Sequence, residues 1–160
     1  MAISGGYTIN HAAAIAGMVA DGQLLNSISK LNKSTTVYIP YGHGVVTDGE
    51  DGAKIPVPGS TSAQFNGVVK YELNRAHTDA TSGAVPLYDM TVVSKGPIWV
   101  YVLDTVVKDA PVYLRVGATD PGKFSGIVGT GATLGVLADA KFLTGGDAGD
   151  LVKISLGLGG

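Results

Sequence analysis

Short runs of β-branched and aromatic residues recur from Thr35 onward, and clusters of glycine, proline, asparagine and aspartate separate them. Runs that follow one another at about 8 to 12 residues, with turn signals between them, are typical of a β-sandwich or β-barrel. Glycine contributes 24 of the 160 residues, roughly twice its average usage, which favours many tight turns. The sequence therefore predicts an all-β fold, an antiparallel β-barrel or sandwich.

The predicted strands are short, and several of them alternate apolar and polar residues. Alternation of this kind places one face of a sheet in a core and the other face outward. Turn signals stand at 48–52, 95–97, 119–122 and 145–149. The strands themselves are predicted at residues 35–39, 45–47, 65–73, 87–93, 98–103, 111–116, 124–128, 140–144 and 151–156.

Residues 1–34 differ from the rest of the chain, because their apolar residues recur at helical spacing. A short helix is predicted over residues 9–20, with Asn10 as its N-cap. A second stripe follows it and consists of Leu24, Leu25, Ile28 and Leu31. We therefore expect a partly helical N-terminal arm (1–34) ahead of a β-barrel or sandwich domain (35–160). Two alternatives stay open for the arm: it reaches a neighbouring subunit, or it lies on the barrel of its own subunit.

Charge is sparse in this chain, since 15% of the residues are charged and the formal net charge is -2. The 11 lysines and arginines are scattered rather than gathered into a basic stripe, which argues against direct binding of nucleic acid. No apolar stretch approaches the ~18 residues that span a bilayer, and the N-terminus carries no recognisable secretion signal. We therefore expect no membrane partner, and synthesis in a cytoplasm.

The sequence contains no convincing chemical motif. The absence of cysteine excludes disulfides and thiolate metal sites. The acidic segment 48–52 resembles a calcium loop only superficially, because Gly59 stands where a bidentate glutamate is needed. The glycine-rich segment 129–135 lacks the spacing and the following helix of a dinucleotide fingerprint. No Gly-x-Ser-x-Gly elbow accompanies the histidines, which are His11, His43 and His77. The sequence thus predicts no catalytic residue, no metal site, no cofactor and no enzymatic activity.

The strand predicted at 98–103 is apolar on both faces. One face holds Trp99, Tyr101 and Leu103. The other face holds Ile98, Val100 and Val102. Such a strand is either central in a sandwich or covered by another chain. Core placement of Trp99, a contact between subunits and a ligand platform are the three alternatives. We predict Trp99 and Tyr101 as contact residues of a homo-oligomer.

Four segments carry packing or turn signatures in a fixed order along the chain. They are Ala14-Ile15-Ala16-Gly17-Met18-Val19-Ala20-Asp21 with Ile28-Ser29-Lys30-Leu31-Asn32; Ile39-Pro40-Tyr41-Gly42-His43-Gly44-Val45-Val46; Gly96-Pro97-Ile98-Trp99-Val100 with Pro111-Val112-Tyr113; and residues 140–144 with 151–156. In this order they resemble the structural cement, or head-decoration, proteins of tailed bacteriophages. One departure is Ala110 before Pro111, where the family pattern has an acidic residue and this chain carries Asp109 one place earlier.

The resemblance implies a β-barrel or sandwich, a homo-oligomer (dimer or trimer), and binding to the major capsid protein on the outer surface of a phage head. It carries over no catalytic residue. The expected function is to bridge adjacent capsid subunits and to stabilise the expanded shell. The residues expected to carry part of the capsid contact are Ile15, Met18, Val19, Leu24, Leu25 and Ile28.

A carbohydrate- or receptor-binding β-module of a virion is the alternative function. Such a module needs an exposed aromatic platform, and no feature of the sequence indicates one. A small hydrolase on a β scaffold is a third class, and it would need a histidine-centred site in a pocket.

Overall fold

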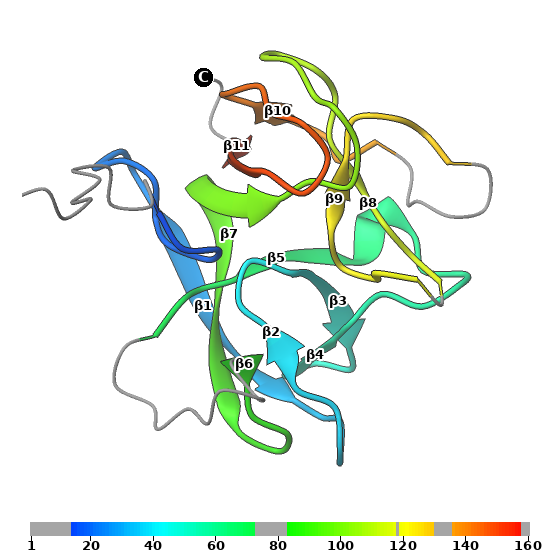
Figure 1. Cartoon of the computed structure of the whole chain (residues 1–160). Helices are drawn as coiled ribbons and strands as arrows, with labels where there is room; N and C mark the ends of the chain where they lie inside the picture. Colours follow the sequence, from blue (N-terminus) through cyan, green and yellow to red (C-terminus); the bar gives the residue numbers. More distant parts are fainter. Residues whose placement is uncertain (1–13, 73–82, 118, 130–135, 158–160) are drawn as a thin grey trace, which may run out of the picture.

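The computed structural model describes residues 14–72, 83–117, 119–129 and 136–157, and these are almost entirely strands and turns (Figure 1). Within these ranges the helical structure is one 3₁₀ turn, η1 (Ser62–Gln64), and no helix has the length and hydropathy needed to cross a bilayer. The predicted all-β fold is confirmed. The strands are β1 (Asn26–Asn32), β2 (Ile39–Pro40), β3 (Gly44–Asp48), β4 (Gly52–Lys54), β5 (Phe65–Val69), β6 (Gly83–Ala84), β7 (Asp89–Tyr101), β8 (Tyr113–Leu114), β9 (Phe124–Ser125), β10 (Ala140–Phe142) and β11 (Leu151–Leu156).

A ring of strands closes into a small barrel. The order β1-β4-β3-β5-β7 returns to its start because β1 also pairs with β7. The β1–β4 pair is parallel and the other pairs of the ring are antiparallel. Because the ring is closed, each of its strands pairs with a neighbour on both edges over at least part of its length. The residues buried in this ring, which we call the barrel core, are Ile39, Tyr41, Val45, Ala53, Val69, Ala84, Met90 and Val92.

The described residues from 96 to 157 form a second lobe beside the barrel (Figure 1). The second half of β7 pairs with β11, and β11 pairs with β10, all antiparallel. The hairpin β8–β9 packs alongside. The cluster buried here, which we call the lobe core, is larger than the barrel core and includes Ile98, Val100, Val102, Val106, Val112, Leu114, Val116, Phe124, Leu137, Ala140, Phe142, Val152, Ile154 and Leu156.

Three valine pairs form the wall that the barrel shares with the second lobe. They are Val45–Val46, Val68–Val69 and Val92–Val93, one pair on each of β3, β5 and β7. One valine of each pair lies in the barrel core and its neighbour lies in the lobe core. Successive side chains on a strand point to opposite faces, so a strand that is buried on both faces needs consecutive apolar residues. These pairs therefore join two cores into one folded unit.

The turn predicted at 95–97 is wrong, because β7 runs through it without interruption. Gly96 adopts φ +118° and lets the strand bend there, and a Cβ on Gly96 would lie 2.9 Å from Cδ1 of Leu25. Both edges of β7 stay occupied at this point. Leu156 pairs with Gly96, and the Ala20 amide donates to the Pro97 carbonyl oxygen at 3.0 Å. Pairing on both edges overrides the local turn signal of the Gly-Pro sequence.

The helical stripe predicted for Leu24 to Leu31 is also wrong, since Asn26–Asn32 is the strand β1. Residues 14–25 contain no helix, and the remainder of the helix predicted over 9–20, with its cap at Asn10, lies outside the described residues. The physical reason is tertiary. β1 fills the gap between β4 and β7 and closes the barrel, so backbone pairing outweighs a weak helical periodicity. The division into an arm (1–34) and a domain (35–160) stays a prediction.

Several further strand predictions are too long, since those at 65–73, 111–116, 124–128 and 140–144 correspond to the shorter strands β5, β8, β9 and β10. Of residues 35–39, only Ile39 belongs to a strand, β2. Leu87 and Tyr88 were expected to begin a strand, but they form the turn that precedes β7. Leu87 has φ +62°, a left-handed conformation that no strand uses. The prediction for residues 151–156 agrees with β11 at both ends.

Candidate interaction surfaces

The described part of the chain holds no cluster of side chains suited to bind a metal ion. Over residues 14–72, 83–117, 119–129 and 136–157, no group of three or more His, Asp or Glu side chains is placed to hold a metal. Segment 48–52 is the hairpin turn between β3 and β4, and the Asp48 carboxylate pairs with Lys54 at 3.1 Å. His11, His77 and most of the glycine-rich segment 129–135 lie outside the described residues.

His43 lies at the junction of the barrel and the second lobe. Its carbonyl oxygen accepts a hydrogen bond from the Val69 amide at 2.9 Å, and the next residue, Gly44, donates to the Gly122 carbonyl oxygen at 2.7 Å. Burial lowers the pKa of the His43 imidazole from 6.5 to about 4. The imidazole is therefore neutral at pH 7 and packs as a structural group between the two parts.

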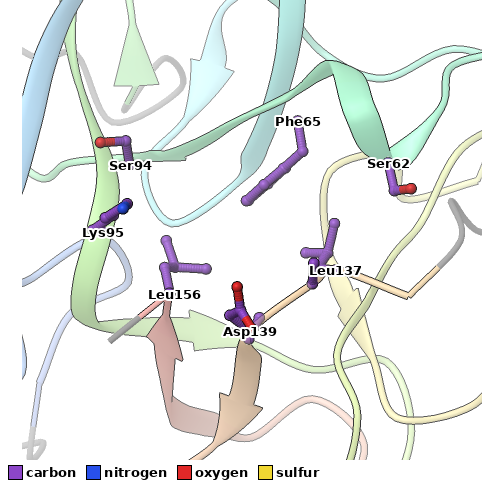
Figure 2. A pocket seen from close by; sticks show the side chains of 10 residues that line it. Ser62, Phe65, Ser94, Lys95, Leu137, Asp139 and Leu156 are labelled. Atoms are coloured by element: carbon purple, nitrogen blue, oxygen red, sulfur yellow. The ribbon is translucent and has the colours of Figure 1, made fainter. Parts of the chain in front are cut away.

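An open pocket of about 240 Å³ lies between β5, β7, β10 and β11. Figure 2 shows three apolar side chains, Phe65, Leu137 and Leu156, that converge on it, with Asp139 at its edge. The Ser94 hydroxyl points away and donates to the Asn26 carbonyl oxygen at 3.2 Å. The pocket is thus an open depression over the lobe core with a mixed lining, since Ser62, Lys95 and Asp139 add polar groups to the apolar side chains.

The N-terminal segment adds a short stretch of pairing to β7. The Gly17 amide donates to the Trp99 carbonyl oxygen at 2.8 Å, and the Trp99 amide donates to the Met18 carbonyl oxygen at 2.9 Å. Val19 pairs with Ile98 in an antiparallel bridge. This register places Met18 opposite Trp99, and directly opposite residues of paired strands share a face. Met18 and Trp99 therefore lie side by side on the outside of the sheet.

β11 extends the same face on the other side of β7. Lys153 is opposite Trp99, and Leu151 is opposite Tyr101. The Lys153 ammonium lies 5.3 Å from the centroid of the Trp99 ring and 3.4 Å from Oδ1 of Asp21. We call this surface the outer face, defined by Met18, Trp99, Tyr101, Leu151 and Lys153. Trp99 is half-buried on it and is not part of either core, so complete burial of Trp99 is not what the structure shows.

The outer face has the composition of a protein-binding surface. Aromatic residues, methionine and few charges are typical of the central part of protein interfaces. Its one cation, Lys153, is already held by Asp21 and the Trp99 ring. Tyr101 remains 44% exposed and Met18 39% exposed, which leaves apolar surface open to a partner.

The structure separates the six predicted contact residues into two groups. Ile15, Met18 and Leu24 are exposed, and Leu24 is 82% exposed. The other three are partly buried: Val19 faces Ile98, Leu25 packs on the lobe core and Ile28 packs on the barrel core. Of the six, the exposed three are therefore available to a partner, and Met18 is the one that adjoins Trp99.

A further exposed surface, at the end of the barrel, was not predicted from the sequence. Asn32 at the end of β1 is completely buried. Its Nδ2 donates to the carbonyl oxygens of Val37 at 3.0 Å and Ala84 at 3.1 Å, and its Oδ1 accepts from the Ser34 amide at 3.1 Å. We define the barrel-end surface by the exposed apolar side chains that surround this anchor: Val37, Tyr38, Val57, Leu87 and Tyr88. A turn signal at Pro86 was the sequence feature that would have taken Leu87 and Tyr88 out of a strand.

Comparisons with known proteins agree with this architecture. A family model described as structural cement protein (E217 gp24/Pam3 gp6) matches residues 3–157. Among solved structures, a chain from "The capsid of Myoviridae Phage XM1" has a TM-score of 0.75 over 98% of both chains at 20% sequence identity, which shows a shared fold. No curated protein sequence matches this chain.

Proposed function

This chain belongs to the phage structural cement protein family, so its role is structural and lies in a phage capsid, and we propose that it binds the outside of the head and bridges adjacent major capsid protein subunits. In this proposal the protein is made in the host cytoplasm and stabilises the expanded shell. The observation that carries it is the outer face, an aromatic and apolar surface on a rigid sheet beside the exposed N-terminal residues.

The outer face suits a contact under tension, because the backbone of β7 is hydrogen-bonded on both edges. Trp99 and Tyr101 sit on β7, which pairs with β11 on one edge and with residues 17–20 on the other. A contact surface that is already ordered loses little conformational entropy when a partner binds. Ile15 and Leu24 are exposed on the same N-terminal segment as Met18, and we assign them to the margin of this contact.

Bridging adds a multivalent term to this contact. One interface of standard size buries about 1,600 Å² in total. When one particle touches two capsid subunits, the second contact forms at high effective concentration, and the joint between the subunits is held without any further interaction. A homo-oligomer of this chain therefore binds the shell more tightly with each further copy that contacts a capsid subunit.

Met18 was predicted as a capsid contact, whereas Trp99 and Tyr101 were predicted as contacts between copies. Because the three side chains share the outer face, we assign the whole face to the capsid partner. Contact between copies through this face is the alternative, and the variants described below test it as well. A carbohydrate platform is disfavoured here, because Lys153 lies over the Trp99 ring that a sugar would need.

The test is binding of purified protein to expanded heads that lack it. Changing Met18 and Tyr101 together to lysine places unpaired charge in the contact, and we expect binding to weaken at least about 100-fold. The matched control is Val136→Lys, since Val136 is 51% exposed in the second lobe and is not part of the outer face.

Co-sedimentation of each variant with heads, followed by thermal release of the packaged DNA, gives the readout. Unchanged binding of the double variant would refute the assignment of the outer face, and failure of the wild-type chain to bind any head would refute the function. Deletion of residues 1–34 is not a usable test, because it removes β1 and opens the barrel.

A further inference from the structure

The turn before β7 is fixed to the end of β1 by the backbone of the buried Asn32. The Leu87 amide donates to the Asn32 carbonyl oxygen at 2.8 Å, and the Asn32 amide donates to the Tyr88 carbonyl oxygen at 3.0 Å. The side chain of the same residue holds the loop at 34–37. Both loops lie at the lower end of the barrel in Figure 1. One buried residue therefore positions both halves of the barrel-end surface.

Leu87 and Tyr88 form a protruding apolar knob. Leu87 is 59% exposed and Tyr88 is 62% exposed, and neither belongs to the barrel core or the lobe core. Leu87 also has φ +62°, which is strained for a side chain with a Cβ. Glycine or asparagine would relieve this strain, so the fold of a single copy does not explain a leucine at this position.

An apolar pocket of about 260 Å³ opens beside the knob. Its walls are Val37, Ile39, Ile55 and Val57, and its rim is formed by Lys33 and the Asp48–Lys54 ion pair. Asn32 lines the pocket as well as binding the knob. The knob and the pocket are thus adjacent on one end of the molecule, and both are apolar.

We propose that the barrel-end surface is a two-fold contact between two copies of this chain, in which the Leu87–Tyr88 knob of each copy enters the apolar pocket of the other. Adjacent complementary features are what an isologous contact requires, because each surface must meet its own rotated image. The five side chains of the surface are each 37% to 62% exposed, which amounts to on the order of 400 Å² of mostly apolar surface. A standard interface uses about 800 Å² per partner, somewhat more than half of it apolar, so this end approaches the apolar area of such an interface.

The role of the dimer in bridging rests on the proposed function. The dimer contact itself is argued from the barrel-end surface alone and does not depend on that function. A dimer joined at the barrel ends leaves both outer faces free, so that one particle offers two equivalent faces to two capsid subunits. This is the arrangement that a bridging protein needs.

Light scattering and sedimentation velocity on the full chain test the contact without any capsid. We expect the wild-type chain to be a dimer, and we expect Leu87→Asn and Tyr88→Lys each to raise the dimer dissociation constant at least about 10-fold. Leu87→Asn keeps the turn, because asparagine tolerates positive φ. Val107→Lys is the matched control, since Val107 is 66% exposed in the second lobe, and it should leave the dimer intact.

A compensating pair identifies the contact itself. Val57→Asp alone should also weaken the dimer, whereas Tyr88→Lys combined with Val57→Asp should restore it, because lysine on each knob then meets aspartate in the partner's pocket. A wild-type monomer, a trimer, or a dimer that both knob variants leave intact would overturn the inference. If the dimer forms as described but the wild-type chain fails to bind heads, the proposed function fails and this contact stands. If knob variants of a monomeric wild-type chain lose head binding, the surface belongs to the capsid partner and the inference is overturned.

Discussion

The barrel and the second lobe are built on different principles. In the barrel, each strand of the ring pairs with two neighbours, and the core inside it is small. In the second lobe, β8, β9 and β10 are two or three residues long, and single bridges such as Pro111 with Lys141 connect the rest. The lobe instead buries Phe124 and Phe142 completely. Backbone pairing thus organises the barrel, and side-chain burial organises the lobe.

The difference extends to the loops. In the lobe, the Asp104 carboxylate accepts hydrogen bonds from the Gly126 amide at 2.8 Å and from the Ser125 hydroxyl, which ties two loops together. Three of the four described non-glycine residues with positive φ are lobe aspartates, and aspartate tolerates this conformation well. The fourth, Leu87, stands at the barrel end. Irregular backbone in the lobe therefore uses residues suited to it, whereas the barrel end carries a strained leucine that we assign to a contact.

The largest expected effect comes from breaking the lobe core. Phe142→Ala should lower the free energy of unfolding by about 3–5 kcal/mol, because it leaves a cavity among fully buried side chains. Because the barrel and the lobe share the valine wall, we expect them to unfold in one transition. Urea unfolding of the variant, followed by both tryptophan fluorescence and far-UV circular dichroism, should show a single midpoint that is lower than the midpoint of the wild-type chain. Tyr101→Ala, at an exposed aromatic position, is the control and should change stability little. Two separate transitions would contradict a single cooperative unit.

A smaller effect is expected at the shared wall itself. Gly67 has φ +135°, and a Cβ there would collide with the Val93 carbonyl oxygen of the neighbouring strand. Gly67→Ala should therefore cost about 3 kcal/mol through strain and displacement of β5 from β7. Gly22→Ala has open space around it and should leave the thermal midpoint unchanged. Equal midpoints for the two variants would show that the wall is not tightly packed at Gly67.

The junction of the two parts should respond to pH through His43. The folded pKa of about 4 lies below the unfolded value of 6.5, so between these values the unfolded chain binds more protons than the folded chain. The stability that this group contributes is present above pH 6.5 and is lost as the pH falls toward 4, with a total of about 3 kcal/mol. Urea unfolding from pH 7.5 to 4 should show this loss in the wild-type chain and a smaller one in His43→Gln. Parallel pH profiles of the two proteins would refute the assignment.

The smallest effect is expected at the barrel end, and it has the opposite sign. Leu87→Asn should raise the stability of the monomer by about 1 kcal/mol, because asparagine adopts positive φ with less strain. The measurement is thermal unfolding at a protein concentration low enough to dissociate any dimer. Leu87→Ala is the control, since it removes the apolar side chain and keeps the strain. Equal stability of the two variants would mean that the backbone at this turn is not strained.

The positions of the lobe strands could be predicted from the sequence, because turn residues bound them, but most of their lengths could not, since β8, β9 and β10 are shorter than the predicted runs. The strand predicted at 151–156 agrees with β11 at both ends, and the segment 98–103 is predicted to be apolar on two faces. The valine pairs were the missed signal. Each indicates a strand buried on both sides, and together they would have predicted two cores that share a wall.

The candidate surfaces could be predicted only in part. Met18, Trp99 and Tyr101 were each selected as contact residues, but nothing in their sequence positions shows that they share a face. That relation depends on the register between residues 17–20 and β7. Leu25 and Ile28 were selected for the same apolar character, and the structure turns them toward the cores. Apolar residues on a short segment have the same sequence signature whether they face a core or a partner.

The sequence by itself determined the all-β class, the absence of recognisable catalytic motifs and the family resemblance, because strand propensity, turn chemistry and motif spacing are local properties. The tertiary structure decided that β1 closes a barrel, that β7 continues through Gly96 and Pro97, and that Asn32 gathers two loops into one surface. Each of these depends on partners distant in sequence: β1 meets β7 more than fifty residues away, as Asn32 meets Ala84. Hydrogen bonds between such partners outweigh local preference, so they are decided only when the whole chain has folded.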